Sequence, residues 1–112
     1  MIAVIFEVTP ADAAPYLGLA ADLAPRLAGL DGFISVERFE SLAQPGKLVS
    51  LSFWRDEAAV AAWRNTPEHR AAQAAGRAGV LSGYRLRIAQ VVRDYGLEDR
   101  AQAPADSRRV NG

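Results

Sequence analysis

The side chains best suited to chemistry gather between Phe53 and Arg77. This segment holds both tryptophans, Trp54 and Trp63, and the only histidine, His69. Imidazole is the one side chain whose ordinary pKa lies near neutrality, so His69 could take a proton from a substrate or accept a hydrogen bond. The two indoles could line an aromatic pocket beside it. We therefore expect any catalytic function to depend on this segment.

A plainer interpretation of the same residues stays open. His69, Gln73 and Arg77 are four residues apart, so on a helix they form one polar stripe, which is typical of a solvated face. If the opposite side of that helix packs on the sheet, His69 would point partly away from the core. That opposite side is marked by alanines at positions 71, 72, 75 and 78. Trp54 and Trp63, likewise, could simply fill the core.

Three further residues are candidates for the site. Two of them, Tyr84 and Arg87, lie beyond the segment from Phe53 to Arg77, and the third, Asn65, lies within it. Tyr84 could line a pocket, and Arg87 could bind an anionic oxygen through its guanidinium. Asn65, between two helix-like stretches, is a candidate substrate ligand. Arginines on strands also commonly form cross-strand ion pairs, here with acids such as Glu37 or Glu40.

Composition excludes several classes of function. The chain has 112 residues, which suits one domain, and its 13 basic and 13 acidic residues balance, which argues against nucleic-acid or anionic-membrane binding. Cysteine is absent, so disulfides, thiolate catalysis, Fe–S clusters and cysteine-based zinc sites are excluded. One histidine with scattered carboxylates gives no metal-ligand spacing. Without a signal peptide or a long apolar run, we expect a soluble cytoplasmic protein.

Four stretches have the composition of β-strands. Each is rich in β-branched or aromatic residues and bounded by turn residues. They are Ile2 to Val8, Phe33 to Glu40, Leu48 to Trp54 and Tyr84 to Arg93. The second and third flank a Pro45-Gly46 turn and are predicted to form an antiparallel hairpin.

Helices are predicted between these strands. An amphipathic stretch from Asp12 to Leu30 follows the first strand, with Asp12 as its N-cap; Pro25 could kink it or end it early. After the third strand, Asp56 can cap a helix over residues 56–64. The run Thr66-Pro67-Glu68 then starts a second helix over 67–78, because it supplies an N-cap, a proline at the first helical position and an acid in the first turn.

The resulting order β-α-β-β-α-β predicts a ferredoxin-like α+β fold, with a four-stranded antiparallel sheet and helices on one face. The other face would carry Val49, Leu51 and Phe53 if the alternate residues of that strand pack on the helices, and an exposed apolar sheet face usually marks an interface. Two such sheets facing each other would form a dimeric α+β barrel. Residues 1–96 make up this domain, and the polar residues 97–112 are expected to form a poorly ordered tail.

The stretch FWRDEAAVAAWRNTPEH, followed by Ala72-Gln73 and Gly76-Arg77, resembles the antibiotic biosynthesis monooxygenase domain of the dimeric α+β barrel superfamily. The resemblance extends over about residues 2–95 and includes Tyr84 near the end. It implies a homodimeric oxygenase that uses no metal or flavin, in which a phenolic or quinol-like substrate loses a proton and reduces dioxygen directly. It also implies a pocket lined by Trp63, His69 and Tyr84 as catalytic residues. The substrate ligands would be Trp54, Asn65 and Arg87.

Two alternatives accompany this resemblance. The chain could be a dimer that binds a small molecule, or serves a structural role, without catalysis. It could also bind or degrade haem, as some relatives of this fold do. Two departures count against haem: the first strand has Phe6-Glu7 where the haem-degrading pattern has an asparagine, and His69 lies only six residues after Trp63.

Overall fold

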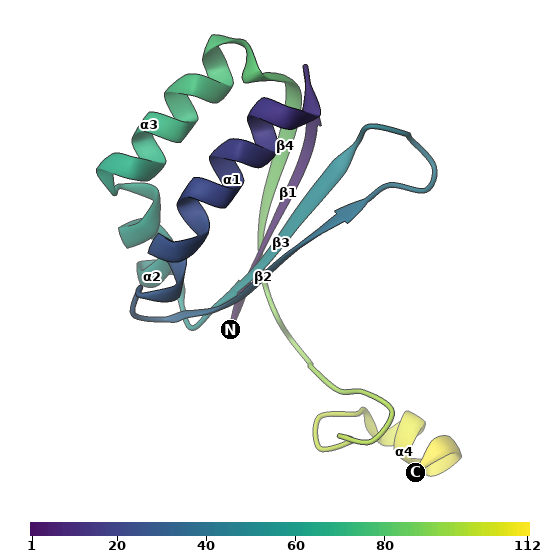
Figure 1. The fold of residues 1–112 in the computed structure, drawn as a ribbon. Coiled ribbons are helices and arrows are strands. Elements are labelled where there is room, and N and C mark those ends of the chain that lie inside the picture. The colour runs from purple at the N-terminus through teal and green to yellow at the C-terminus, as the bar shows by residue number, and fades with distance from the viewer.

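The strands and helices follow the predicted order in the computed structural model, which describes all 112 residues (Figure 1). The four strands form one antiparallel sheet in the order β2-β3-β1-β4. They are β1 (Ile2–Pro10), β2 (Phe33–Glu40), β3 (Leu48–Trp54) and β4 (Leu81–Gln90). The three helices α1 (Ala13–Ala28), α2 (Glu57–Arg64) and α3 (Pro67–Ala75) lie on one side of this sheet. The ferredoxin-like prediction is therefore confirmed.

The predicted helix starts are confirmed by their capping hydrogen bonds. The Asp12 carboxylate accepts from the Ala14 N–H at 3.3 Å, and the Asp56 carboxylate accepts from the Ala59 N–H at 2.8 Å. Thr66 caps α3, so the break between α2 and α3 is real. Pro25 lies inside α1 without ending it. The second half of the broken helix ends at Ala75 rather than residue 78, because a wide turn, η1 (Gly76–Val80), follows.

The last strand lies three residues earlier than predicted, at Leu81–Gln90 instead of 84–93. The pairing with β1 determines where β4 begins and ends. β4 pairs with β1, and Gln90 stands opposite Ile2 at the very start of β1. Beyond that point the only remaining ladder bond is from the Val91 N–H to the Met1 carbonyl, at 3.0 Å. Apolar composition alone could not indicate where the partner strand begins.

The register assigns the two faces of the sheet. Residues directly opposite one another on antiparallel strands share a face. Ile2 stands opposite Trp54, and both belong to the buried core. The helices contribute the rest of that core, namely Leu27, Ala59, Val60 and Trp63. The even-numbered residues of β1 and β3 therefore face the helices, as predicted for β3.

The opposite face of the sheet has no helix over it (Figure 1). Five of its side chains are large and apolar, and each is half-buried or exposed. They are Ile5, Phe39, Val49, Leu51 and Phe53. We call this set the outer apolar face.

Beyond β4 the chain leaves the sheet and ends in α4 (Ala105–Asn111), apart from the rest of the molecule (Figure 1). This is the segment predicted to be a polar tail. Its hydrogen bonds are internal: Arg100 donates to the carbonyls of Gly96 and Gly112 and to the Ser107 hydroxyl. The segment thus has local structure of its own. No helix in the structure is both long enough and apolar enough to cross a membrane.

Candidate functional site

His69 lies against Trp63. The two ring centroids are 4.7 Å apart and the ring planes are inclined at 49°. The helix break produces this contact, because both the N–H and the hydroxyl of Thr66 bond to the Trp63 carbonyl, at 3.1 and 2.9 Å. Thr66 Oγ1 in turn accepts from the His69 N–H at 3.2 Å. The imidazole is half-buried on the core side of α3, so the alanine pattern was misleading about its direction.

An ion pair fixes the start of α3. Arg26, in the last turn of α1, donates to the Glu68 carboxylate at 2.9 Å. The Arg26 side chain is 56% exposed and that of Glu68 is 36% exposed, so solvent screens the pair and it contributes little to stability. It does tie the residue next to His69 to the end of α1, whose Leu27 contacts the same core as Trp63.

The surroundings of His69 favour its neutral form. Burial lowers the pKa of the imidazole, and the positive charges of Arg70 and Arg64 lower it further, while the Trp63 carbonyl acts in the opposite direction. Nδ1 is buried and has no hydrogen-bond partner. A neutral imidazole at physiological pH can accept a proton.

Trp54 lies in the same core as Trp63 but has a different environment. Only 1% of Trp54 is exposed, and its indole N–H donates to the Ser52 hydroxyl at 2.9 Å. Its ring meets Phe33 edge-on, with centroids 5.3 Å apart. Its indole N–H is hydrogen-bonded and its ring is covered, so Trp54 cannot contact a ligand. It is a residue of the core that also contains Trp63.

Tyr84 faces the helices but stands at the other end of the sheet. It is opposite Val8, whereas the core around Trp63 includes Ile2. Six residues of extended strand separate Ile2 from Val8, which is about 20 Å. Tyr84 instead packs on Phe6, with ring centroids 5.7 Å apart, and is 54% exposed. The structure therefore does not bring Tyr84 into contact with the Trp63–His69 pair.

Arg87 lies on the outer face, away from that pair. It stands opposite Ile5 and forms an ion pair with Glu7 at 2.5 Å. Arg87 and Lys47 both lower the pKa of the Glu7 carboxyl. The expected cross-strand ion pair thus exists, but with Glu7 instead of Glu37 or Glu40, because β4 neighbours β1. Within one chain, Arg87 cannot reach a ligand held beside His69.

Asn65 is engaged at the end of α2. Its amide nitrogen donates to the Ala61 carbonyl at 2.9 Å, and its amide oxygen accepts from Arg70. The side chain is exposed, and both of its polar atoms have partners. Its observed role is to close one helix just before the next begins.

Arg38 was not among the site residues predicted from the sequence. This side chain is half-buried on the helix-facing side of β2, opposite Ser50, and its Nε is buried with no hydrogen-bond partner. Strand alternation could have placed Arg38 on the helix-facing side only if the pairing register of β2 with β3 had been known. A shift between Phe33 and Ser35 turns Val36 and Arg38 toward the helices and leaves Phe39 on the outer face.

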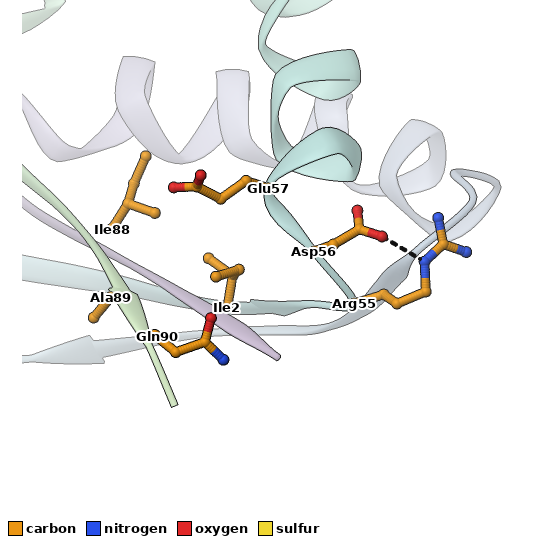
Figure 2. A pocket seen from close by; sticks show the side chains of 7 residues that line it. All are labelled: Ile2, Arg55, Asp56, Glu57, Ile88, Ala89 and Gln90. Atoms are coloured by element: carbon orange, nitrogen blue, oxygen red, sulfur yellow. Dashed lines mark hydrogen bonds and ion pairs between the residues drawn. The ribbon is translucent and has the colours of Figure 1, made fainter. Parts of the chain in front are cut away.

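A hollow of about 420 Å³ opens beside the start of α2 (Figure 2). Ile2, Ile88 and Glu57 line it, but Trp63, His69 and Tyr84 do not. Its other charged groups are occupied. Arg55 binds Asp56 at 2.9 Å and Asp31 at 3.1 Å, and Asp56 caps α2, which keeps the Asp56 pKa low. The hollow is thus bordered by side chains that stabilise a helix start.

The structure contains no group of three or more His, Cys, Asp or Glu side chains that could hold a metal ion. The chemically distinctive features are therefore the Trp63–His69 contact and the unpartnered Nε of Arg38.

Comparison with known sequences identifies relatives. The sequence pattern of the family described as antibiotic biosynthesis monooxygenase matches residues 1–75. The chain is 50% identical over 93 residues to jasmonate monooxygenase ABM of Pyricularia oryzae (strain 70-15), an alignment that covers 81% of this chain and 43% of that protein. The chain thus spans less than half the length of this curated relative.

Solved structures share the fold. A protein from Deinococcus radiodurans assigned to antibiotic biosynthesis monooxygenases superposes with a TM-score of 0.76 at 17% identity, over 86% of this chain and 97% of that chain. SnoaB, a cofactor-independent oxygenase from Streptomyces nogalater, superposes with a TM-score of 0.71 at 18% identity, over 83% of this chain and 94% of its own. At such identities the likeness establishes the architecture alone.

Proposed function

Because the chain belongs to the antibiotic biosynthesis monooxygenase family, we propose that it oxidises a small, largely apolar substrate with dioxygen and without metal, flavin or haem. The named activity of the Pyricularia relative supports a monooxygenase. The cofactor-independent chemistry of SnoaB, which has the same fold, supports the absence of a cofactor. The activity proposed is that of this domain, since the relative is more than twice as long as the matched region.

One observation carries the proposal: a half-buried imidazole lies against an indole, in surroundings that lower the pKa of the imidazole. A phenolic substrate beside this pair would give its hydroxyl proton to His69, and the phenolate would then reduce dioxygen. In the conversion of a phenol to a quinone, one oxygen atom enters the ring and the other leaves as water, and the substrate supplies all the electrons. No external reductant is required.

Jasmonate is a second substrate class, and the 50% identity to the Pyricularia protein favours it. Jasmonate is a ketone that also carries a carboxylate. A base can remove a proton from the CH₂ group next to its carbonyl group, and the resulting enolate, like a phenolate, can reduce dioxygen. That carbon then becomes a second carbonyl group with one oxygen atom from dioxygen, and the other oxygen atom leaves as water with the two hydrogens of the CH₂ group. The same imidazole would serve both substrate classes.

Oxygen uptake tests the proposal. The purified protein would be given hydroquinone-type phenols or jasmonate, with a chelator present and no added cofactor. With ¹⁸O₂, mass spectrometry should find one labelled oxygen atom in the product. His69→Gln should lower the rate of uptake by about 10²- to 10⁴-fold, while Arg77→Gln, an exposed change further along the same segment, should leave it unchanged. Substrate binding without uptake would favour the alternative of a non-catalytic binding protein, and a Soret band after haem titration would favour a haem protein.

We also propose that the protein is a homodimer built through the outer apolar face. Five large apolar side chains on an uncovered sheet face support this, because such a patch usually marks an interface. In a dimer of this kind the two sheets would face each other, and Arg87 and Glu7 would lie within or beside the interface.

A further inference from the structure

Arg38 is a charged group without a partner. None of its nitrogens takes part in a hydrogen bond or an ion pair, and its Nε is shielded from solvent. A guanidinium stays protonated at any physiological pH. A buried donor left unsatisfied is costly, so such groups in native proteins call for an explanation.

The acids nearest in the sequence do not neutralise this charge. Glu37 points to the other face of the sheet, as strand alternation requires. Glu40 shares the helix-facing side two residues further on, yet it forms no ion pair with Arg38. The guanidinium is therefore free to bind an anion supplied from outside the chain.

The sheet register shows what lies next to Arg38. One row of paired residues crosses the helix-facing side in the order Arg38, Ser50, Phe6, Leu86. The Ser50 hydroxyl makes no hydrogen bond to the protein, and the Phe6 ring packs on Tyr84. We call these residues the Arg38–Phe6 row. It begins with a cation, continues with a small hydroxyl and ends in aromatic and aliphatic groups.

The spacing of the row limits the ligand. Neighbouring strands lie about 4.8 Å apart, so the backbones at Arg38 and Phe6 are separated by about 10 Å. A small molecule with a carboxylate at one end and a ring or short alkyl body at the other would match this length. Guanidinium binds carboxylate in a bidentate geometry, and the Phe6–Tyr84 pair offers an apolar surface to the body.

We propose that Arg38 binds the carboxylate of an apolar organic acid whose body lies over Ser50 toward Phe6. This inference goes beyond the proposed oxidation, because the row ends at the Phe6–Tyr84 pair and Tyr84 does not contact the Trp63–His69 pair. It adds a ligand-binding residue on β2, at the far edge of the sheet from Tyr84.

The test measures binding without turnover. Quenching of tryptophan fluorescence would be titrated with jasmonate and with its methyl ester, and with a phenyl-substituted short-chain acid and its methyl ester. Wild-type protein should bind each acid more tightly than its ester. Arg38→Gln should weaken binding of the acids by about tenfold to a hundredfold and leave the esters unchanged. Arg38→Lys should retain part of the preference, and Arg77→Gln should retain all of it.

Any other pattern overturns the inference: no binding of either acid, equal binding of acid and ester by the wild type, or equal loss of both in Arg38→Gln. A thermal unfolding curve for Arg38→Gln at or above that of the wild type would exclude a folding defect. The outcome is also separate from that of the oxygenase proposal. Acid binding that depends on Arg38 without oxygen uptake would sink the oxygenase alone, and oxygen uptake without acid binding that depends on Arg38 would sink the role of Arg38 alone.

Discussion

Replacing His69 with glutamine is the most direct test of the proposed chemistry. Glutamine keeps a polar group of similar reach in the position that packs on Trp63, but it cannot take up a proton. General-base catalysis contributes about 10²- to 10⁴-fold to the rates of enzymes that use it. We therefore expect kcat to fall by a factor in this range while substrate binding changes little.

The pH dependence supplies a second, sharper measurement. Because burial and the charges of Arg70 and Arg64 lower the pKa of His69, the neutral base should persist below the ordinary histidine pKa of about 6.5. A plot of kcat/KM against pH, measured by oxygen uptake, should therefore be flat near neutrality. It should fall only when the pH drops below about 6.5. An acid-limb pKa at or above 6.5, or full activity in His69→Gln, would refute the assignment.

The same shift predicts how stability depends on pH. A group whose pKa is lower in the folded state binds protons more weakly there than in the unfolded chain, so acid favours unfolding. The contribution of His69 should be fully present above about 6.5 and should be lost as the pH falls through the lowered folded-state pKa. Urea unfolding at pH 7.5 and pH 5 should show a larger acid-induced loss for the wild type than for His69→Gln. Equal losses would mean that the imidazole is solvated.

Four further variants test the fold and its surfaces. Gly32→Ala should lower the free energy of unfolding by about 2–4 kcal/mol in chemical denaturation, because φ is +84° and a Cβ would lie 2.6 Å from that of Ala59; Gly18→Ala, in open space on α1, should raise it by about 1 kcal/mol. Arg38→Met should raise stability by about 1 kcal/mol in the same assay, since an unpartnered charge is removed; a loss would mean that the guanidinium has a structural partner. Leu51→Glu should convert the protein from dimer to monomer in light scattering, and a monomeric wild type would contradict the proposed interface.

The architecture was predictable because several independent signals agree. Three capping residues, Asp12, Asp56 and Thr66, each precede a predicted helix, and all three accept the expected backbone hydrogen bond. The hairpin turn and the four apolar runs then leave few possible topologies. The limits of β4 were not predictable, because they depend on where β1 begins and not on the residues of β4 itself.

The site was harder to predict because it depends on register. Which face Arg38 takes is decided by a shift near Phe33, and a displacement of one residue reverses every side chain that follows. Arg87 is a similar case. Its sequence context marks it as a strand arginine, but only the pairing of β4 with β1 shows that it meets Glu7 on the outer face.

His69 shows how one local feature can carry both fold and chemistry. The polar stripe and the alanines suggested an outward imidazole, an inference that treats α3 as an isolated helix. It omits the break at Thr66, whose hydroxyl and N–H both bond to the Trp63 carbonyl and so bring the first turn of α3 back over the indole. The residues Thr66-Pro67-Glu68 produce that break, and they are part of the stretch that resembles the family. The residues that restart the helix are thus the ones that hold the candidate base against the core, and lengthening the junction by one residue should separate the two rings and abolish the lowered pKa of His69.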